Sequence, residues 1–183
     1  MKKYLITSRE FYTDTPAIFR NILDQQFVQH KPDFALYRDK LNPNYTVQAS
    51  HFIEVCSQFE NIKSFIHRDV TLAKQLDATG VHLTSSQFNE IEYALSLNLE
   101  VIISTHSYDE VVKAQKLGAS YVTYSPIFAS PNKGKPKGLE NLKELLLETD
   151  IKIFALGGIV TDQHLQDISQ MNIFGFASIR YFY

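Results

Sequence analysis

The sequence predicts an α/β protein, a compact (β/α)8 TIM barrel whose final helix is missing or truncated. Short apolar segments of β-prone residues recur eight times along the chain, and patterns with helical spacing lie between them. The repeat is about 22 residues long, which is typical of parallel βα units. Eight such units favour a closed barrel over a doubly wound sheet, although a barrel usually takes about 250 residues and this chain has 183.

The eight expected strands are short runs of mainly apolar residues. They cover residues 4–7, 34–37, 64–67, 81–83, 101–104, 121–125, 153–156 and 174–178. After the last run the chain ends with "IRYFY", so we expect no complete helix over the eighth strand. The aromatic ending is expected to pack at the point of barrel closure or against a second subunit of a homodimer.

Helices are expected between the strands because apolar residues recur there at i, i+3 and i+4. The apolar stripes are Ile18, Ile22 and Leu23; Phe52, Val55, Cys56 and Phe59; Ile91, Ala94 and Leu95; Val111, Val112, Ala114 and Leu117; Leu142, Leu145 and Leu146; and a weaker stretch over 161–168. Ser107 and Glu110 form a capping box before one helix, and Thr161 can cap another. Gly80 and Gly118 are expected to end helices.

Composition narrows the class of protein. Hydrophobic residues make up 44% of the chain and charged residues 21%, as in ordinary globular proteins, and we expect one domain over residues 1–183. The net charge of −2 provides no general attraction to nucleic acid or to an anionic membrane, so neither is an expected partner. Cys56 is the only cysteine, which excludes a disulfide framework and a cysteine zinc site. The N-terminal apolar run is too short for a signal peptide, and we expect a cytoplasmic protein.

The expected carboxyl ends of the strands are rich in cations, and barrel sites lie at these ends. Five of the eight ends carry one or more: Arg9; Arg38 and Lys40; Arg68; Lys133; and Arg180. Each alone is most simply a solvated charge, but cations crowded at one rim repel each other unless an anion offsets them. Gly157 and Gly158 follow the seventh strand, where glycine lets backbone N–H groups approach a phosphate. A simple turn and a solvated loop are the alternatives for this glycine pair and for the lysine-rich loop at 130–137.

The motifs together resemble the thiamine phosphate synthase/TenI family of (β/α)8 barrels. They are "YLITS", "YRDK", "GVHL", "STHSYDEVVKAQKLGASYV", "SPIFASPNKGKPKGL", "ALGGI" and "GFASI", and the stretch 104–139 is the most specific. The resemblance implies phosphorylated thiazole or pyrimidine ligands. In the synthases of this family a pyrimidine diphosphate ionises, a thiazole phosphate captures the cation, and Mg²⁺ holds the diphosphate.

The resemblance also implies roles for individual residues. Arg38 and Lys40 match the family's diphosphate-binding Arg and Lys, and Gly158 matches the glycine that binds the thiazole phosphate. Ser130, Asn132 and Lys133 match its Thr-x-Thr-Lys phosphate loop, while Arg180 stands where the family usually has a small Ser. We add Ser104, Gly157 and Arg68 to this set of expected phosphate-binding residues.

This chain departs from the synthases at the metal site. His67 and Arg68 replace an Asn-Asp pair, and Gln87 replaces a second Asp, so both aspartates that would hold Mg²⁺ are changed. No cofactor is therefore expected, with Mg²⁺ required only if the chain acts as a synthase. Leu36 likewise replaces a pyrimidine-binding Gln.

These departures favour a TenI-like enzyme, which isomerises a thiazole carboxylate phosphate. The alternative is thiamine phosphate synthase, and further alternatives are a non-catalytic binding or regulatory protein and a barrel for another phosphorylated metabolite. Pro126 occupies the position of the TenI acid/base histidine. We choose His67 as the catalytic residue because Arg68 beside it lowers its pKa towards the neutral base. His82 is expected to be a packed core residue, and His106 to cap or pack.

Overall fold

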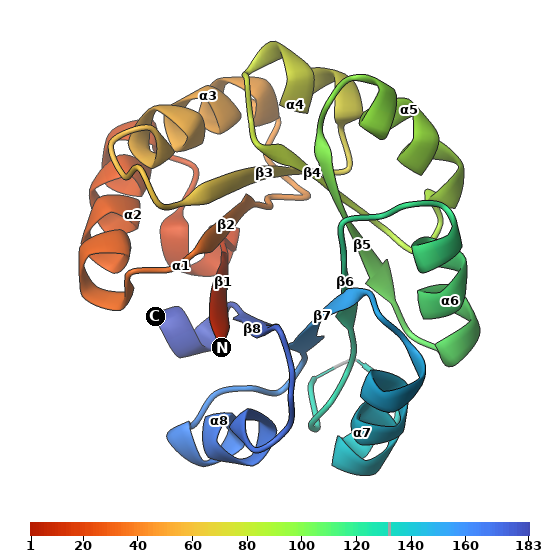
Figure 1. The fold of residues 1–183 in the computed structure, drawn as a ribbon. Coiled ribbons are helices and arrows are strands. Elements are labelled where there is room, and N and C mark those ends of the chain that lie inside the picture. Colours follow the sequence, from red (N-terminus) through yellow and green to blue (C-terminus); the bar gives the residue numbers. More distant parts are fainter. Residues whose placement is uncertain (132) are drawn as a thin grey trace.

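A computed structural model describes residues 1–131 and 133–183, and it is a closed barrel of eight parallel strands (Figure 1). The strands are β1 (Lys2–Ile6), β2 (Phe34–Tyr37), β3 (Lys63–His67), β4 (Gly80–Leu83), β5 (Glu100–Thr105), β6 (Tyr121–Tyr124), β7 (Lys152–Leu156) and β8 (Gly175–Ser178). Each pairs with its neighbours in sequence, and β8 closes the barrel on β1, with Tyr4 opposite Ala177. The predicted fold and strand order are confirmed, with strand ends shifted by at most a residue or two.

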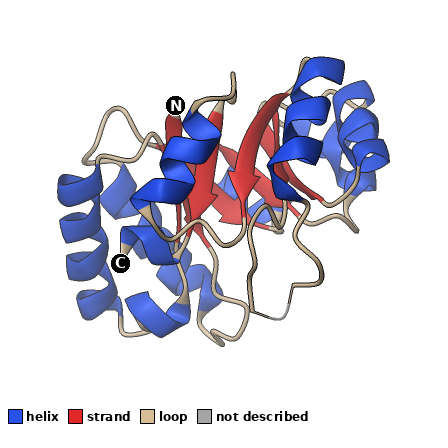
Figure 2. Cartoon of the chain, turned by 90° about the horizontal axis from the view of Figure 1, so that it is seen from below, coloured by secondary structure: helices blue, strands red, loops and turns tan. Residues whose placement is uncertain are grey.

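The helices flank the strands on the outside of the barrel (Figure 2). They are α1 (Arg9–Tyr12), α2 (Pro16–His30), α3 (Tyr45–Cys56), α4 (Val70–Gln75), the 3-10 turn η1 (Phe88–Glu90), α5 (Ile91–Ser96), α6 (Tyr108–Lys116), α7 (Gly138–Glu148) and α8 (Asp162–Ser169). The predicted caps form: Ser107 accepts a hydrogen bond from the Glu110 N–H, and Thr161 accepts one from the His164 N–H. Gly118 follows α6 in the left-handed region, with φ of +82°.

Gly80 does not end a helix as the sequence suggested; it is the first residue of β4. A Cβ atom there would lie 2.1 Å from the carbonyl oxygen of Glu100 and 2.6 Å from the Phe65 ring. The close approach of two strand backbones, and not a left-handed turn, therefore requires glycine at this position.

Alternate strand residues point into the barrel and out towards the helices. Those that fill the interior are Tyr4, Ile6, Phe34, Leu36, Phe65, Ile102, Tyr121, Phe154 and Ala177. Aromatic rings dominate this set: the Phe154 ring centroid lies 5.0 Å from that of Phe34 and 5.1 Å from that of Tyr4. These contacts fill the amino-terminal half of the barrel, so a ligand can enter only from the opposite end.

After β8 the structure has one 3-10 turn, η2 (Arg180–Phe182), whereas each of the other strands is followed by an α-helix. Phe182 is fully buried and stacks on Phe176 with ring centroids 5.6 Å apart. Tyr183 packs against Phe11, with centroids 4.5 Å apart. The expected absence of a complete helix over β8 holds for the described residues, and η2 lies beside β1 and β8 (Figure 1). Among the described helices, none has both the length and the apolar character needed to span a membrane.

Candidate active site

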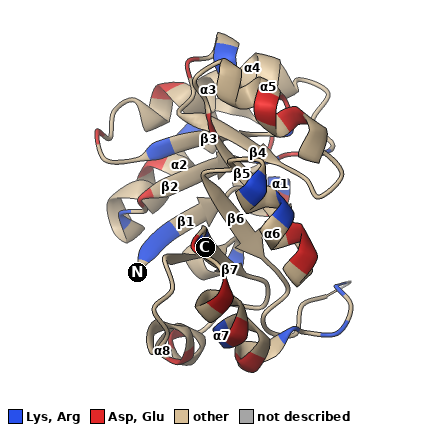
Figure 3. Cartoon of the chain, turned by 45° about the vertical axis from the view of Figure 1, so that its right-hand side comes forward, with Lys and Arg blue, Asp and Glu red and all other residues tan. Residues whose placement is uncertain are grey.

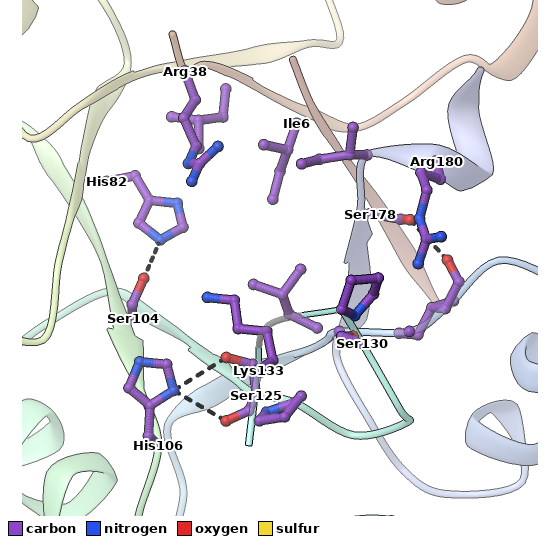
Figure 4. Close-up of a pocket in the computed structure, with 18 of the residues that line it drawn as sticks. Ile6, Arg38, His82, Ser104, His106, Ser125, Ser130, Lys133, Ser178 and Arg180 are labelled. Carbon is purple, nitrogen blue, oxygen red and sulfur yellow. Dashed lines mark hydrogen bonds between the residues drawn. The ribbon is translucent and has the colours of Figure 1, made fainter. Parts of the chain in front are cut away.

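A cavity of about 360 Å³ opens at the carboxyl ends of the strands (Figure 4). Ile6, Leu36 and Leu156 are apolar residues of its lining that pack on the aromatic interior. Two residues after an inward-facing apolar residue, the next inward-facing residue is polar. Arg38 follows Leu36 in this way, and Ser104 follows Ile102. The strand alternation that fills the barrel therefore also directs polar side chains into the cavity.

Nearly all of the predicted site residues meet in this cavity. Its lining includes Arg38, Lys40, His67, Ser104, Ser130, Lys133, Gly157, Gly158 and Arg180. Arg68 lines a separate, shallower hollow with Asp69 and Gln87, because it follows β3 in the left-handed conformation with φ of +71°. Asn132 lies outside the described residues. Arg9 turns away from the cavity and pairs with Asp14.

Arg38, Lys40 and Lys133 form one group of cations, which we call the cation cluster. The pKa of Lys40 is lowered chiefly by Arg38, then by burial, Lys133 and Arg68. Burial also lowers the pKa of Arg38. No Asp or Glu among the described residues lines the cavity, and the ion pairs of the described chain involve other cations. Many of the acidic residues belong instead to the outer helices, such as α5, α6 and α7 in Figure 3.

A second group of donors lies across the cavity, where β7 and β8 end. Gly157 and Gly158 have φ of +99° and +72°, and a Cβ on either would collide with the backbone of the loop after β6 at less than 3 Å. Within the described residues, the N–H groups of Gly158 and Arg180 have no acceptor in the protein. Arg38 and Arg180 lie on opposite sides of the cavity, and the Lys133 side chain extends towards the Arg38 side (Figure 4).

The loop that carries Lys133 is anchored at its base to the glycine turn. The Phe128 N–H donates to the carbonyl oxygen of Gly157 at 3.0 Å, and the Lys137 N–H donates to that of Pro126 at 2.7 Å. Lys133 itself is exposed and lines the cavity. The loop is therefore held at both ends, and Lys133 is an exposed residue between them.

Tyr4, His82 and Ser104 form a hydrogen-bonded chain from the barrel interior to the cavity. The Tyr4 hydroxyl lies 2.8 Å from His82 Nδ1, and His82 Nε2 lies 3.0 Å from Ser104 Oγ. Burial raises the pKa of Tyr4, so its hydroxyl stays protonated and donates to Nδ1. His82 must then be the Nε2–H tautomer and donate to Ser104, since burial and Arg38 lower its pKa to about 3. Ser104 can therefore direct its own proton at an anion in the cavity.

Two further histidines line the cavity. His106 Nδ1 lies 3.0 Å from the Ser125 carbonyl oxygen, which only accepts, so Nδ1 carries the proton and Nε2 is left as an acceptor when the ring is neutral. His67 is buried, and its pKa is far below the ordinary value because of burial, then His82, Arg38, Lys40 and Arg68. His67 is therefore neutral and a weak base. The sequence argument missed His82 and His106 as cavity residues, although the spacing of two along β4 places His82 inward after Gly80.

The side chains at the two replaced metal positions do not suit Mg²⁺, which prefers carboxylate or phosphate oxygens. The Gln87 amide oxygen already accepts from the Thr84 N–H at 3.1 Å, and the Gln87 amide nitrogen donates to Glu90 at 3.0 Å. Asp69 Oδ1 caps α4 by accepting from the Leu72 N–H at 2.8 Å. Among the described residues, no group of three or more His, Cys, Asp or Glu side chains could hold a metal ion.

The family model that matches this chain, and two curated proteins similar to it, are described as thiamine-phosphate synthases. The family model described as thiamine monophosphate synthase matches residues 3–182. The thiamine-phosphate synthase of Lactococcus lactis subsp. cremoris (strain MG1363) is 29% identical over 132 residues, which cover 69% of this chain and 60% of that protein. The thiamine-phosphate synthase of Lactococcus lactis subsp. lactis (strain IL1403) is 25% identical over 195 residues, covering 98% of this chain and 90% of that protein.

A solved structure has the same fold. Thiamine phosphate pyrophosphorylase from Pyrococcus furiosus superposes with a TM-score of 0.81 over 97% of this chain and 85% of its own, at 23% identity. The chain spans 60% of the length of the first Lactococcus relative, but the family model covers almost all of this chain. With its barrel, its cation-lined cavity and this match along its length, the chain belongs to the thiamine monophosphate synthase family.

Proposed function

We propose that this protein is a thiamine phosphate synthase, a transferase that joins a pyrimidine diphosphate to a thiazole phosphate. One observation carries the proposal: the cavity has two separate groups of anion donors on opposite sides, with an apolar lining between them. A cavity for one monophosphate needs one such group, whereas two phosphorylated substrates need both. The named relatives are synthases, which supports this alternative over the isomerase that the sequence favoured.

The two groups suit different substrates. The Gly158 and Arg180 side of the cavity offers backbone N–H groups and one guanidinium, which suits the single phosphate of the thiazole. The cation cluster on the other side suits the higher charge of a diphosphate. Ile6, Leu36 and Leu156 then face the two heterocycles, and the thiazole nitrogen approaches the methylene carbon of the pyrimidine.

The chemical step requires charge stabilisation and no change in oxidation state. The bond between the methylene carbon and the diphosphate oxygen breaks, and its electron pair leaves with the diphosphate. The thiazole nitrogen supplies the pair for the new carbon–nitrogen bond. Negative charge grows on the leaving group in the transition state, so fixed cations beside it accelerate the reaction.

Isomerisation of a thiazole carboxylate phosphate is the second candidate, and His106 favours it. The contact with Ser125 leaves His106 Nε2 as an unprotonated acceptor at the cavity wall, which is the form that a proton-transfer catalyst needs. The predicted base, His67, is a weaker candidate because its pKa is so strongly lowered.

The test is to incubate the purified protein with both substrates and to separate the products by liquid chromatography with mass detection. Synthase activity is expected to give thiamine phosphate and pyrophosphate, and Arg38→Met should lose most of it. Lys135→Met is the matched control, since Lys135 is an exposed lysine of the same loop that does not line the cavity. In a separate incubation with the thiazole carboxylate phosphate as the sole substrate, interconversion of its tautomers would favour the isomerase. Binding of the substrates without turnover would favour a regulatory protein. Either of these two results contradicts the synthase proposal.

A further inference from the structure

The cation cluster carries more positive charge than its surroundings compensate. Arg38, Lys40 and Lys133 line one cavity, each of the other two lowers the pKa of Lys40, and no described carboxylate lines the cavity with them. Holding like charges together in this way costs folding free energy, and half-buried Arg38 also loses solvation. Asp39 offsets part of this charge, since it acts to raise the pKa of Arg38, but burial outweighs it and the Arg38 pKa is still lowered. Three cations with only partial compensation indicate a ligand with several negative charges.

The carboxylates beside the two replaced metal positions already have hydrogen-bond partners in the protein, and Asp39, next to the cluster, is buried and does not line the cavity. The Gln87 amide donates a hydrogen bond to the Glu90 carboxylate, and the Asp69 carboxylate caps α4. The position beside them is taken by Arg68, which adds a further positive charge to the field at Lys40. A divalent cation placed here would meet repulsion from four positive side chains.

We propose that this protein binds the diphosphate of its substrate directly through Arg38, Lys40 and Lys133, without a divalent metal. This inference rests on the proposed function only for the identity of the ligand, a pyrimidine diphosphate. When the carbon–oxygen bond breaks, the electron pair goes to the diphosphate oxygen and the leaving group gains one negative charge. The three side chains offset that charge, and inorganic pyrophosphate is the product that they release.

Direct binding has a consequence that distinguishes it from metal-bridged binding. A magnesium ion in solution forms a complex with pyrophosphate and reduces its net charge, so this complex should bind to a purely cationic site less tightly than free pyrophosphate. Added Mg²⁺ should therefore weaken binding here. A protein that uses carboxylates to hold the metal should show the opposite response.

Titration calorimetry with inorganic pyrophosphate tests this on the full-length protein. In EDTA we expect saturable binding, and with excess Mg²⁺ we expect affinity that is lower by about threefold or more. Arg38→Met, Lys40→Met and Lys133→Met should each weaken binding in EDTA by about 10-fold or more, because each removes a charge-assisted hydrogen bond. Lys135→Met should change it by less than about twofold. Thermal melting of each variant establishes that it is folded.

The inference is overturned if pyrophosphate binds only when Mg²⁺ is added, or in neither condition, or if the three variants bind as the wild type does. Turnover of both substrates in EDTA and in Mg²⁺ separates this from the proposed function. Product that forms only with Mg²⁺, together with metal-dependent pyrophosphate binding, refutes the metal-free site and leaves the synthase intact. Binding in EDTA with no product in either buffer refutes the synthase and leaves the site intact.

Discussion

The two ends of this barrel are built from the same strands, but their cationic side chains have different surroundings. At the amino-terminal end, Lys63 pairs with Glu100 and lies 3.3 Å from the Tyr121 hydroxyl, and Lys152 lies over aromatic rings. At the carboxyl-terminal end, Arg38, Lys40 and Lys133 line a cavity with no carboxylate among the described residues. Compensated cations stabilise a fold, whereas uncompensated ones at a cavity are available for a ligand.

The interiors of the two ends differ in the same sense. Below the cavity the inward-facing residues are large aromatic rings in mutual contact. The inward-facing residues that line the cavity include histidine, serine and arginine. Inside the barrel, the burial of large apolar side chains is therefore concentrated in the amino-terminal half, and polar groups that can contact a ligand are concentrated in the carboxyl-terminal half. Four predictions separate these contributions.

The largest expected effect is on stability, from Phe154→Ala in the aromatic interior. Phe154 is fully buried against Tyr4, Phe34 and Tyr121, so the truncation should lower the free energy of unfolding by about 3–5 kcal/mol. Urea denaturation measures this change. Leu147→Ala is the control because Leu147 is 80% exposed, and it should change stability by less than about 0.5 kcal/mol. Equal losses in the two variants would contradict the division between the two ends.

The next effect is on ligand affinity, from Arg38→Met. Methionine keeps the apolar stem and removes the charge, so pyrophosphate affinity should fall by about 10- to 100-fold, which corresponds to about 1.5–3 kcal/mol. The melting temperature should stay the same or rise, because the repulsion within the cation cluster is relieved. A clear fall in melting temperature together with unchanged affinity would identify Arg38 as a structural residue.

A smaller effect comes from the glycine turn, tested by Gly158→Ala beside Gly138→Ala. Both positions have positive φ, near +72° and +78°, so backbone strain alone should cost each variant about 1–2 kcal/mol of stability, and the collision at Gly158 should add to it. Only at Gly158 would the new Cβ meet a backbone atom, the Ala129 oxygen at 2.6 Å, whereas Gly138 has free space. Calorimetry with the thiazole phosphate should show weaker binding for Gly158→Ala alone. Equal affinities would exclude the turn from the phosphate site.

The effect that is smallest at neutral pH is a pH dependence of stability, which grows as the pH is lowered. Burial lowers the pKa of His67 and of His82 in the folded protein, so below pH about 6.5 the unfolded chain binds protons that the folded chain does not. Stability is therefore full above that pH and is lost as the pH falls, by up to about 1.4 kcal/mol per pH unit for each histidine. Urea denaturation between pH 7 and 5 measures the slope. His67→Gln should make it shallower, and an unchanged slope would contradict the buried, neutral histidine.

Strand alternation and helical spacing were sufficient to predict the barrel, because both patterns are local and repeat with every βα unit. The cavity was predictable as far as residues follow strand ends in sequence, as Arg38, Lys133 and Gly158 do. The residues of the cavity wall were less predictable from the sequence. Whether His82 is only a core residue or also reaches the cavity depends on its depth in the barrel. Its hydrogen bonds are to Tyr4 on β1 and Ser104 on β5, which are far from it in sequence.

Turn geometry also escaped the sequence argument. Arg68 follows β3 as the other strand-end cations follow their strands, yet its positive φ directs it to a neighbouring hollow. Arg9 pairs with Asp14, five residues along the chain, and leaves the rim for that reason. A cation after a strand therefore identifies the correct end of the barrel but not which cations reach the cavity.

The most direct test of the two-sided cavity is a crystal structure of the protein grown with the thiazole phosphate and pyrophosphate together. The account predicts the phosphate at the Gly158 and Arg180 side and pyrophosphate in contact with Arg38, Lys40 and Lys133. Both ligands in one place, or either at the amino-terminal end beside Lys152, would contradict it.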